Sequence, residues 1–192
     1  MAIQINGDGT ITGISVGGLP NGIVDTDMLA ANAVSAAKLA SGAGGKVLQV
    51  VQSSTSSEHV NQTTTFADTN LSGSITPSST SSKILVTVSQ AYEITRNSTE
   101  AGGSIRLLRD STVIESAVSS DGGKFKLYMY TNAASGYSQY NAYSVTILDS
   151  PNTTSAITYK TQSAVYIANS SGRVKSQSGG IPSYITMMEI AA

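Results

Sequence analysis

YSVTILDSPNTTSAITYKTQSAVYI, residues 143–167, contains two runs in which apolar and polar residues alternate, the pattern of half-buried β-strands. Between the runs, Asp149-Ser150-Pro151-Asn152 combines a ring that fixes φ with side chains that hydrogen-bond their own backbone. The stretch therefore predicts a β-hairpin, and its apolar face needs a second sheet to cover it. That face comprises Tyr143, Val145 and Ile147 in the first run and Ile157, Tyr159, Val165 and Ile167 in the second.

Similar runs, separated by turn residues, fill the chain from residue 46 to residue 192. Asp110 and Ser111 separate two of them by the spacing of a hairpin. No helical period interrupts the series, so we expect a mainly β head of jelly-roll type, built as a two-sheet sandwich over residues 46–192. Besides the two runs above, the expected strands are residues 47–52, 59–66, 70–76, 83–94, 104–109, 112–119, 124–130 and 184–190.

The composition argues against several classes of partner. The 192-residue chain is 12% charged with a net charge of -1, which gives no electrostatic footprint for nucleic acid or anionic lipid. It has no cysteine, so stability must come from packing or from association. Neither a signal-peptide pattern nor a run of ~18 apolar residues is visible, so we expect a soluble product without membrane insertion.

Residues 1–20 predict a small attachment hairpin. Ile3 and Ile5 precede the turn sequence Asn6-Gly7-Asp8-Gly9, and Ile11 follows it, with glycines where the turn needs positive φ. A ribbon with about three residues on each side is marginal alone. We therefore expect Ile3, Ile5 and Ile11 to attach this hairpin to other chains.

Residues 21–45 predict a stalk or linker. Asp25, Thr26 or Asp27 could cap a helix. Its apolar residues would be Met28, Leu29, Val34 and Leu39, but these positions keep neither a 3.5-residue nor a 3.6-residue period. The serine and glycines of residues 41–45 would end such a helix. So narrow an apolar stripe favours a segment wound with identical copies over a helix that covers its own sheet.

The segment ITGISVGGLPNGIVDTDMLAANAVSAAKLA, residues 11–40, resembles stalk segments of tailed-bacteriophage fibre proteins. The stretches SKILVTVSQ, IRLLRDSTVI, SVTILDSPNTTSAITYK and ITMMEIAA resemble the C-terminal head of such fibres, whose strand order is similar to the complement and tumour-necrosis-factor jelly roll. The resemblance implies a homotrimer in the virion, anchored to other virion proteins by its N-terminus, with a distal head that meets the host surface. A single stalk block implies a short appendage.

No residue pattern predicts catalysis, a cofactor or a metal site. His59 is the only histidine, and a surface role is favoured over a ligand or a base. Residues 42–46 differ from a phosphate loop because Ala40 stands where its first glycine would be. Turn oxygens could hold calcium, but no loop has the ordered acidic spacing that calcium sites show. Carboxylates at turns favour backbone capping over glycoside cleavage; these are Asp68, Asp110, Asp121 and Asp149.

Tyrosines gather between residues 128 and 143, beside asparagine, serine and glutamine. Flat amphipathic rings beside amides suit a carbohydrate or protein surface. For Tyr128 and Tyr130, which alternate with an apolar face, a trimer interface or the core is the favoured explanation. Tyr137 and Tyr140 lie near Gly136, where we expect an exposed loop. They are the candidate contacts with a host-surface glycan or protein.

The final run, residues 185–190, carries Met187, Met188 and Ile190 on both faces. A strand that is apolar on both faces should lie inside an assembly, so these three residues are candidates for a trimer interface.

The sequence thus predicts a non-enzymatic virion component, a short trimeric fibre-like protein made in the host cytoplasm. One alternative is a head decoration or a neck or tail adaptor that binds only virion proteins. A second, from another class, is a non-viral lectin or adhesin.

Overall fold

The computed structural model describes residues 4–5, 11–12, 34, 46–96, 100–116, 127–130, 136–165 and 172–192. The chain divides into two units, residues 1–45 and 46–192. In the first unit, β1 (Gln4–Ile5) pairs with β2 (Ile11–Thr12) in antiparallel fashion, and Ile5 lies opposite Ile11. This is the strand pair that the turn sequence predicts. No helix within the described ranges is long and apolar enough to cross a membrane.

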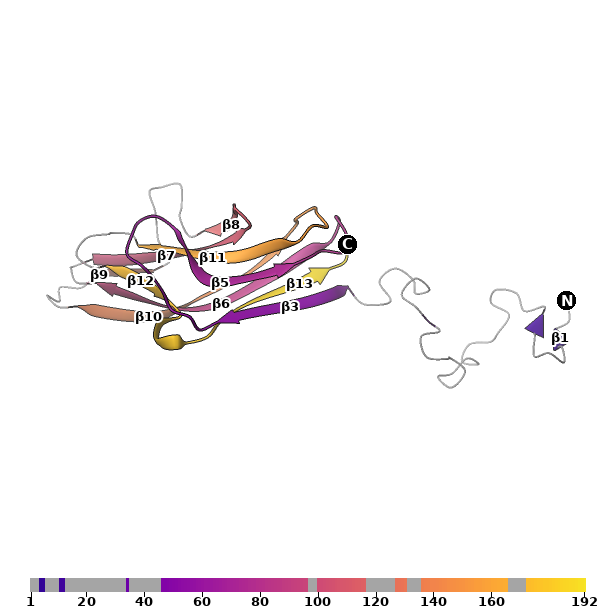
Figure 1. Ribbon diagram of the computed structural model, residues 1–192, viewed down its shortest axis with the longest axis horizontal. Helices are drawn as coiled ribbons and strands as arrows, with labels where there is room; N and C mark the ends of the chain where they lie inside the picture. The colour runs from indigo at the N-terminus through magenta and orange to yellow at the C-terminus, as the bar shows by residue number, and fades with distance from the viewer. Residues whose placement is uncertain are drawn as a thin grey trace. The chain divides into compact units, whose positions relative to one another are not determined.

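The second unit, the head, is a sandwich of two antiparallel sheets (Figure 1). A short 3₁₀ helix, η3 (Ser178–Gly180), precedes the last strand. Sheet I contains β3 (Val47–Thr55), β4 (His59–Asn61), β6 (Lys83–Arg96), β10 (Tyr137–Asp149), β12 (Arg173–Ser176) and β13 (Ser183–Ile190). Sheet II contains β5 (Ala67–Ile75), β7 (Glu100–Arg109), β8 (Thr112–Ser116), β9 (Leu127–Tyr130) and β11 (Ile157–Val165).

The strand order is that of a jelly roll. In sheet I, β3, β13, β6 and β10 are successive neighbours, and β12 and β4 continue the sheet beside the other half of β6. In sheet II, the order is β5, β11 and β7, followed by β8 and β9. The prediction of a mainly β jelly-roll sandwich is confirmed, and the β7–β8 hairpin turns at Asp110 and Ser111 as expected.

The hairpin predicted for residues 143–167 is wrong, although both of its strands exist. β10 pairs with β6 in sheet I, whereas β11 pairs with β5 and β7 in sheet II. Residues 150–156 therefore cross from one sheet to the other. Asp149 stabilises this crossing, because its carboxylate accepts hydrogen bonds from Arg109 at 2.7 Å and from the Tyr159 hydroxyl at 2.7 Å. The sequence pattern did not distinguish the two cases, because two strands show the same alternation of apolar and polar residues whether they pair in one sheet or face each other across a sandwich.

The core lies between the sheets and consists mainly of aliphatic side chains. It follows the predicted alternation, since Tyr143, Ile157, Tyr159 and Val165 are all buried in it. Its centre also holds a polar pair, in which the Gln90 amide donates to the Thr69 hydroxyl at 2.9 Å. The remaining buried members include Leu71, Ile75, Ile84, Val86, Val88, Tyr92, Ile94, Ile105, Leu107, Val174, Ile185 and Met187.

The clearest departures from the predicted strands are one strand that ends early and one strand that was not predicted. The strand expected over residues 59–66 ends at Asn61, because its side chain bonds to the following turn instead of continuing the ladder. The Asn61 carboxamide oxygen accepts from the Thr63 N–H at 2.8 Å, and its nitrogen donates to the Thr65 carbonyl at 2.9 Å. The four-residue strand β12 was not predicted, since it is too short to show a periodic pattern.

Candidate functional site

The outer face of sheet I carries a continuous apolar row across four adjacent strands. The ladder places Val50 of β3, Met188 of β13, Leu85 of β6 and Leu148 of β10 side by side. Their chain neighbours point into the core, so these four side chains point outward. Val50 is 57% exposed and Leu148 is 51% exposed, while Met188 and Leu85 are half-buried between them.

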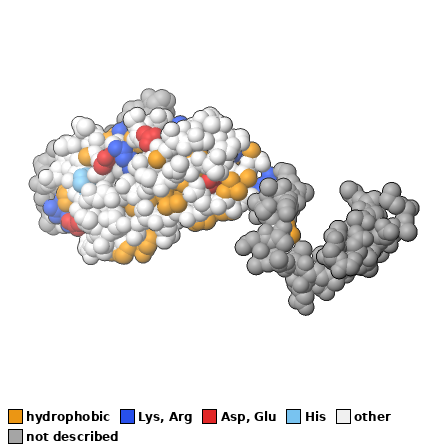
Figure 2. Space-filling model, turned by 45° about the vertical axis from the view of Figure 1, so that its right-hand side comes forward, with side chains coloured by type: hydrophobic (Ala, Val, Ile, Leu, Met, Phe, Trp, Pro, Cys, Tyr) orange, Lys and Arg blue, Asp and Glu red, His pale blue; other side chains and the backbone are white. Residues whose placement is uncertain are grey.

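The rows beside this apolar row are uncharged. One contains Gln52, Thr186, Thr87 and Thr146, and the next contains Ser54, Tyr184, Ser89 and Ser144. Together with the apolar row they form three rows of four outward residues, named the neutral face from here on. Lys83, next to Ile190, lies just beyond its edge. Figure 2 shows hydrophobic side chains gathered along the lower side of the head, the side on which β3 and β10 lie in Figure 1.

The outer face of sheet II is charged by contrast. The Lys160 ammonium lies 2.9 Å from the Asp68 carboxylate, which also accepts from the Gln162 amide at 2.7 Å. Arg106 donates to the other end of Gln162 at 2.6 Å and lies 3.9 Å above the Phe66 ring. Burial acts to raise the pKa of Asp68, but the hydrogen bonds from Gln162 and Lys160 outweigh it, so this pKa lies below its ordinary value.

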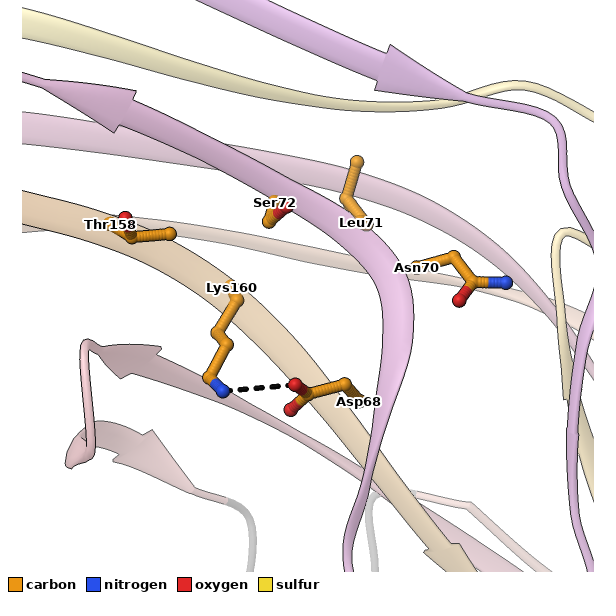
Figure 3. A pocket seen from close by; sticks show the side chains of 6 residues that line it. All are labelled: Asp68, Asn70, Leu71, Ser72, Thr158 and Lys160. Carbon is orange, nitrogen blue, oxygen red and sulfur yellow. Dashed lines mark hydrogen bonds and ion pairs between the residues drawn. The ribbon is translucent and has the colours of Figure 1, made fainter.

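A hollow of about 260 Å³ opens beside this ion pair (Figure 3). The hollow forms at a bulge in β5. Lys160 lies opposite Ser72 and Gln162 lies opposite Asp68, so between these two pairs β5 contains two more residues than β11. Asn70 takes the resulting left-handed backbone, with φ of 67°. The two charged residues that line the hollow, Asp68 and Lys160, neutralise each other. The hollow therefore offers a ligand hydroxyl and amide groups but no unpaired charge. The lining residues are Asp68, Asn70, Leu71, Ser72, Thr158 and Lys160.

The residues predicted for a trimer interface separate into two groups. Met187 points into the core of its own head and is fully buried there. Met188 lies on the neutral face and Ile190 at its edge, both half-buried. The interface prediction is thereby narrowed to Met188 and Ile190, since the alternation of β13 leaves Met187 no access to a partner chain.

Tyr137 and Tyr140 lie in β10, not in the loop that their glycine neighbour suggests. They are 50% and 65% exposed. Tyr137 pairs with Arg96 and Tyr140 with Glu93 in the ladder, so the two side chains leave the strand on opposite sides. They are therefore not one stacking platform, and each is a separate candidate contact.

The other sequence-predicted residues are distributed as follows. Ile5 and Ile11 form the cross-strand pair of the N-terminal hairpin, whereas Ile3, the stalk apart from Val34, and Asp121 lie outside the described residues. His59 is half-buried on β4. Within the part of the chain that the structure describes, no three histidine or acidic side chains come close enough together to hold a metal ion.

Sequence reasoning missed most of the neutral face. Leu85 and Leu148 could have indicated it, because each is an apolar residue on the outward side of its strand. The next outward residues, Thr87 and Thr146, are polar. Their assembly into one row depends on which strands are neighbours. That order is decided by long-range pairing, so a search along the chain does not show it.

No protein-family model matches this sequence, and no curated protein matches it. Among solved structures, the chain is similar to the VP2 subviral particle of infectious bursal disease virus, with 10% identity over 77% of this chain and 34% of that chain, at a TM-score of 0.41. It is also similar to a crystal structure of the infectious bursal disease virus particle, with 11% identity over 77% of this chain and 37% of that chain, at a TM-score of 0.35. The chain thus spans about a third of these solved chains.

Proposed function

We propose that the protein is a structural component of a bacteriophage particle, a short homotrimeric fibre-like appendage. The N-terminal hairpin attaches it to other virion proteins, and the jelly-roll head faces the host surface. The observation that carries this proposal is the β1–β2 ladder, in which the described residues form two pairs, Gln4 with Thr12 and Ile5 with Ile11. A two-stranded ribbon of this size gains order by packing on another chain.

The head has what the hairpin lacks, its own core between two sheets. A head with its own core is suited to be carried at the free end of an attached chain. The sequence resemblance of residues 11–40 and of four head stretches to phage fibre proteins supports the same division of roles. Recognition of a host glycan or protein would then rest on exposed side chains of the head, with Tyr137 and Tyr140 as the first candidates.

Deletion of residues 2–20 in the phage genome tests this proposal. We expect the truncated protein to accumulate with a folded head, shown by an unchanged circular dichroism spectrum, but to be missing from purified particles. Ile5→Ser together with Ile11→Ser should give the same loss by removing the cross-strand pair, whereas Ile11→Val should retain incorporation. Normal incorporation of the truncated chain would exclude attachment by the hairpin.

A further inference from the structure

The hollow on the outer face of sheet II has a wall that the core holds in place. This wall is the arch of β5 at residues 69–71, which the bulge creates. Behind the arch, the Thr69 hydroxyl bonds to the Thr161 hydroxyl at 2.5 Å and accepts from the Gln90 amide at 2.9 Å. Leu71 is buried in the core. The shape of the hollow therefore exists before a ligand arrives, which lowers the cost of ordering side chains on binding.

The rim of the hollow presents donors and acceptors side by side. The Lys160 ammonium carries three N–H groups and gives one of them to Asp68 at 2.9 Å. The Asp68 carboxylate accepts this bond on one oxygen and the Gln162 amide on the other, and each oxygen can accept a second bond. The side chains of Lys160 and Asp68 are 28% and 53% exposed, so a ligand can reach both. The hydroxyls of Ser72 and Thr158 complete the polar lining.

We propose that this hollow binds one uncharged sugar unit of a glycan. A sugar hydroxyl both donates and accepts, so it fits a rim where ammonium donors and carboxylate acceptors lie next to each other. An anionic group would approach Asp68 and a cationic group would approach Lys160, which disfavours charged ligands of either sign. The inference rests on the proposed function only for the source of the glycan, the host surface.

The size and apolar surface of the hollow fit the same ligand. Its volume of about 260 Å³ lies below the ~300–1,000 Å³ of pockets for drug-sized molecules, which suits one ring. Figure 3 shows the Lys160 side chain reaching from β11 toward Asp68, and its methylene stem can cover the C–H groups of a ring. A ring of about 12 non-hydrogen atoms binds at the usual ligand efficiency with a Kd of about 1 mM or weaker.

This site is separate from the exposed tyrosines. Tyr137 and Tyr140 lie on β10 of sheet I, whereas the hollow lies between β5 and β11 of sheet II. A substitution in the hollow therefore leaves both tyrosines unchanged, and the two contacts can be tested one at a time.

An NMR titration of the isotope-labelled full chain tests the inference. The probes are the methyl glycosides of glucose, galactose, mannose and N-acetylglucosamine. We expect at least one of them to shift the amide signals of residues 68–72 and 158–160 and to leave those of β13 unchanged. D-glucuronate and D-glucosamine, which carry one negative and one positive charge, should bind more weakly. If none of the four glycosides moves these signals at about 100 mM, the inference is wrong.

Filling the hollow gives a matched pair of variants. Ser72→Phe places a ring in the hollow and retains the Asp68–Lys160 pair, and Ser72 is exposed, so the fold should be kept. We expect this variant to lose the glycoside shifts. Ser81→Phe adds the same ring at an exposed position of the turn before β6 and should bind as the unaltered protein does. Unchanged binding by Ser72→Phe would overturn the inference.

Asp68→Asn tests the charge argument, because the amide retains a hydrogen-bond acceptor for Lys160 but leaves the ammonium charge unbalanced. D-glucuronate should bind this variant roughly fivefold more tightly than it binds the unaltered protein, the factor for one unit charge at about 4 Å in water. An unchanged preference for uncharged over anionic sugars would show that the ion pair does not select the ligand, against the inference.

The inference and the proposed function fail separately. The titration uses the isolated chain, so it does not depend on attachment to a particle. Normal incorporation of the chain that lacks residues 2–20 would exclude attachment by the hairpin and leave the glycoside shifts as they are. Absence of the shifts would remove the sugar site and leave attachment by the hairpin untouched.

Discussion

Glu189 is a carboxylate on the core side of β13, in phase with Ile185 and Met187. It stays charged because its oxygens accept from the Ser78 N–H at 2.7 Å, the Ser78 hydroxyl at 2.6 Å and the Gln49 amide at 2.6 Å. Burial acts to raise its pKa, but these hydrogen bonds outweigh it and lower the pKa to about 2. Burial also acts to raise the pKa of Glu93, but its bonds with Ser178, Thr95 and Lys175 outweigh burial and lower this pKa to about 2.

These two groups predict an acid-sensitive head. A folded-state pKa below the ordinary value of 4.5 contributes stability that is present above about pH 4.5 and is lost as the pH falls toward 2. The difference corresponds to about 3 kcal/mol for Glu189. Glu189→Gln should therefore lower the free energy of unfolding by roughly 2–3 kcal/mol at pH 7 and flatten its fall between pH 5 and 2.5, measured by urea unfolding.

Ser78→Ala is the graded control, because it removes one hydroxyl donor and keeps the N–H. It should cost about 1 kcal/mol at pH 7 and retain most of the acid dependence. An acid dependence that is as steep in Glu189→Gln as in the unaltered protein would contradict the assignment to this residue.

At the scale of elements, Gly103 of β7 packs closely on β6 and β12 across the sandwich. A Cβ atom added at Gly103 would lie 2.5 Å from a methyl of Val174 and 2.8 Å from a methyl of Ile94, both fully buried. Neither branched side chain has room to move away. The absence of a side chain at Gly103 thus sets how closely sheet II packs on sheet I.

Gly103→Ala should destabilise the head by about 1–3 kcal/mol through overpacking, measured as a lower urea midpoint with an unchanged slope. Gly73→Ala is the comparison. There the nearest atom, at 2.6 Å, is the terminal methyl of Met187, which is flexible and can turn aside. We expect a smaller loss for Gly73→Ala, and equal losses would show that sheet spacing is not the limiting factor at Gly103.

At the scale of the whole molecule, the two candidate contacts with the host lie near one end of β10, on its two faces. Tyr137 and Tyr140 leave β10 on opposite sides, so a glycan or protein would meet them singly. In the proposed assembly weak contacts of this kind would suffice, because three heads per trimer and several trimers per particle would raise avidity by ~10² to 10⁴ when the sites engage together. The small net charge of -1 predicts that such binding changes little with salt.

Particles that carry Tyr137→Ala or Tyr140→Ala should adsorb to host cells more slowly than unaltered particles, with the larger loss at the more exposed Tyr140. Phenylalanine at either position retains the ring and is the matched control. Undiminished adsorption of the double alanine variant would exclude both residues as necessary contacts. Undiminished adsorption after antibody blocking of the entire head would favour a decoration or adaptor protein over a fibre.

The sequence by itself determined most of the strands, the jelly-roll class and the inward faces of β10 and β11, because alternation is a local property with a period of two residues. It also determined the N-terminal strand pair, because the turn between two such short strands fixes which residues lie opposite each other. Only the tertiary structure decided that residues 143–167 cross between the sheets rather than form a hairpin. The reason is that β10 pairs with β6 and β11 pairs with β5, both of which lie far away in the sequence.

The neutral face follows the same division. The leucines at 85 and 148 are visible in the sequence, but their row with Val50 and Met188 exists because β3, β13, β6 and β10 are neighbours. Likewise, the alternation that makes β13 apolar on both sides is readable from residues 185–190, whereas the burial of Met187 beside an ionised Glu189 depends on partners more than 100 positions away, such as Ser78 at 2.7 Å. Pairing over such distances is chosen by the packing of the complete fold, and no local pattern records it.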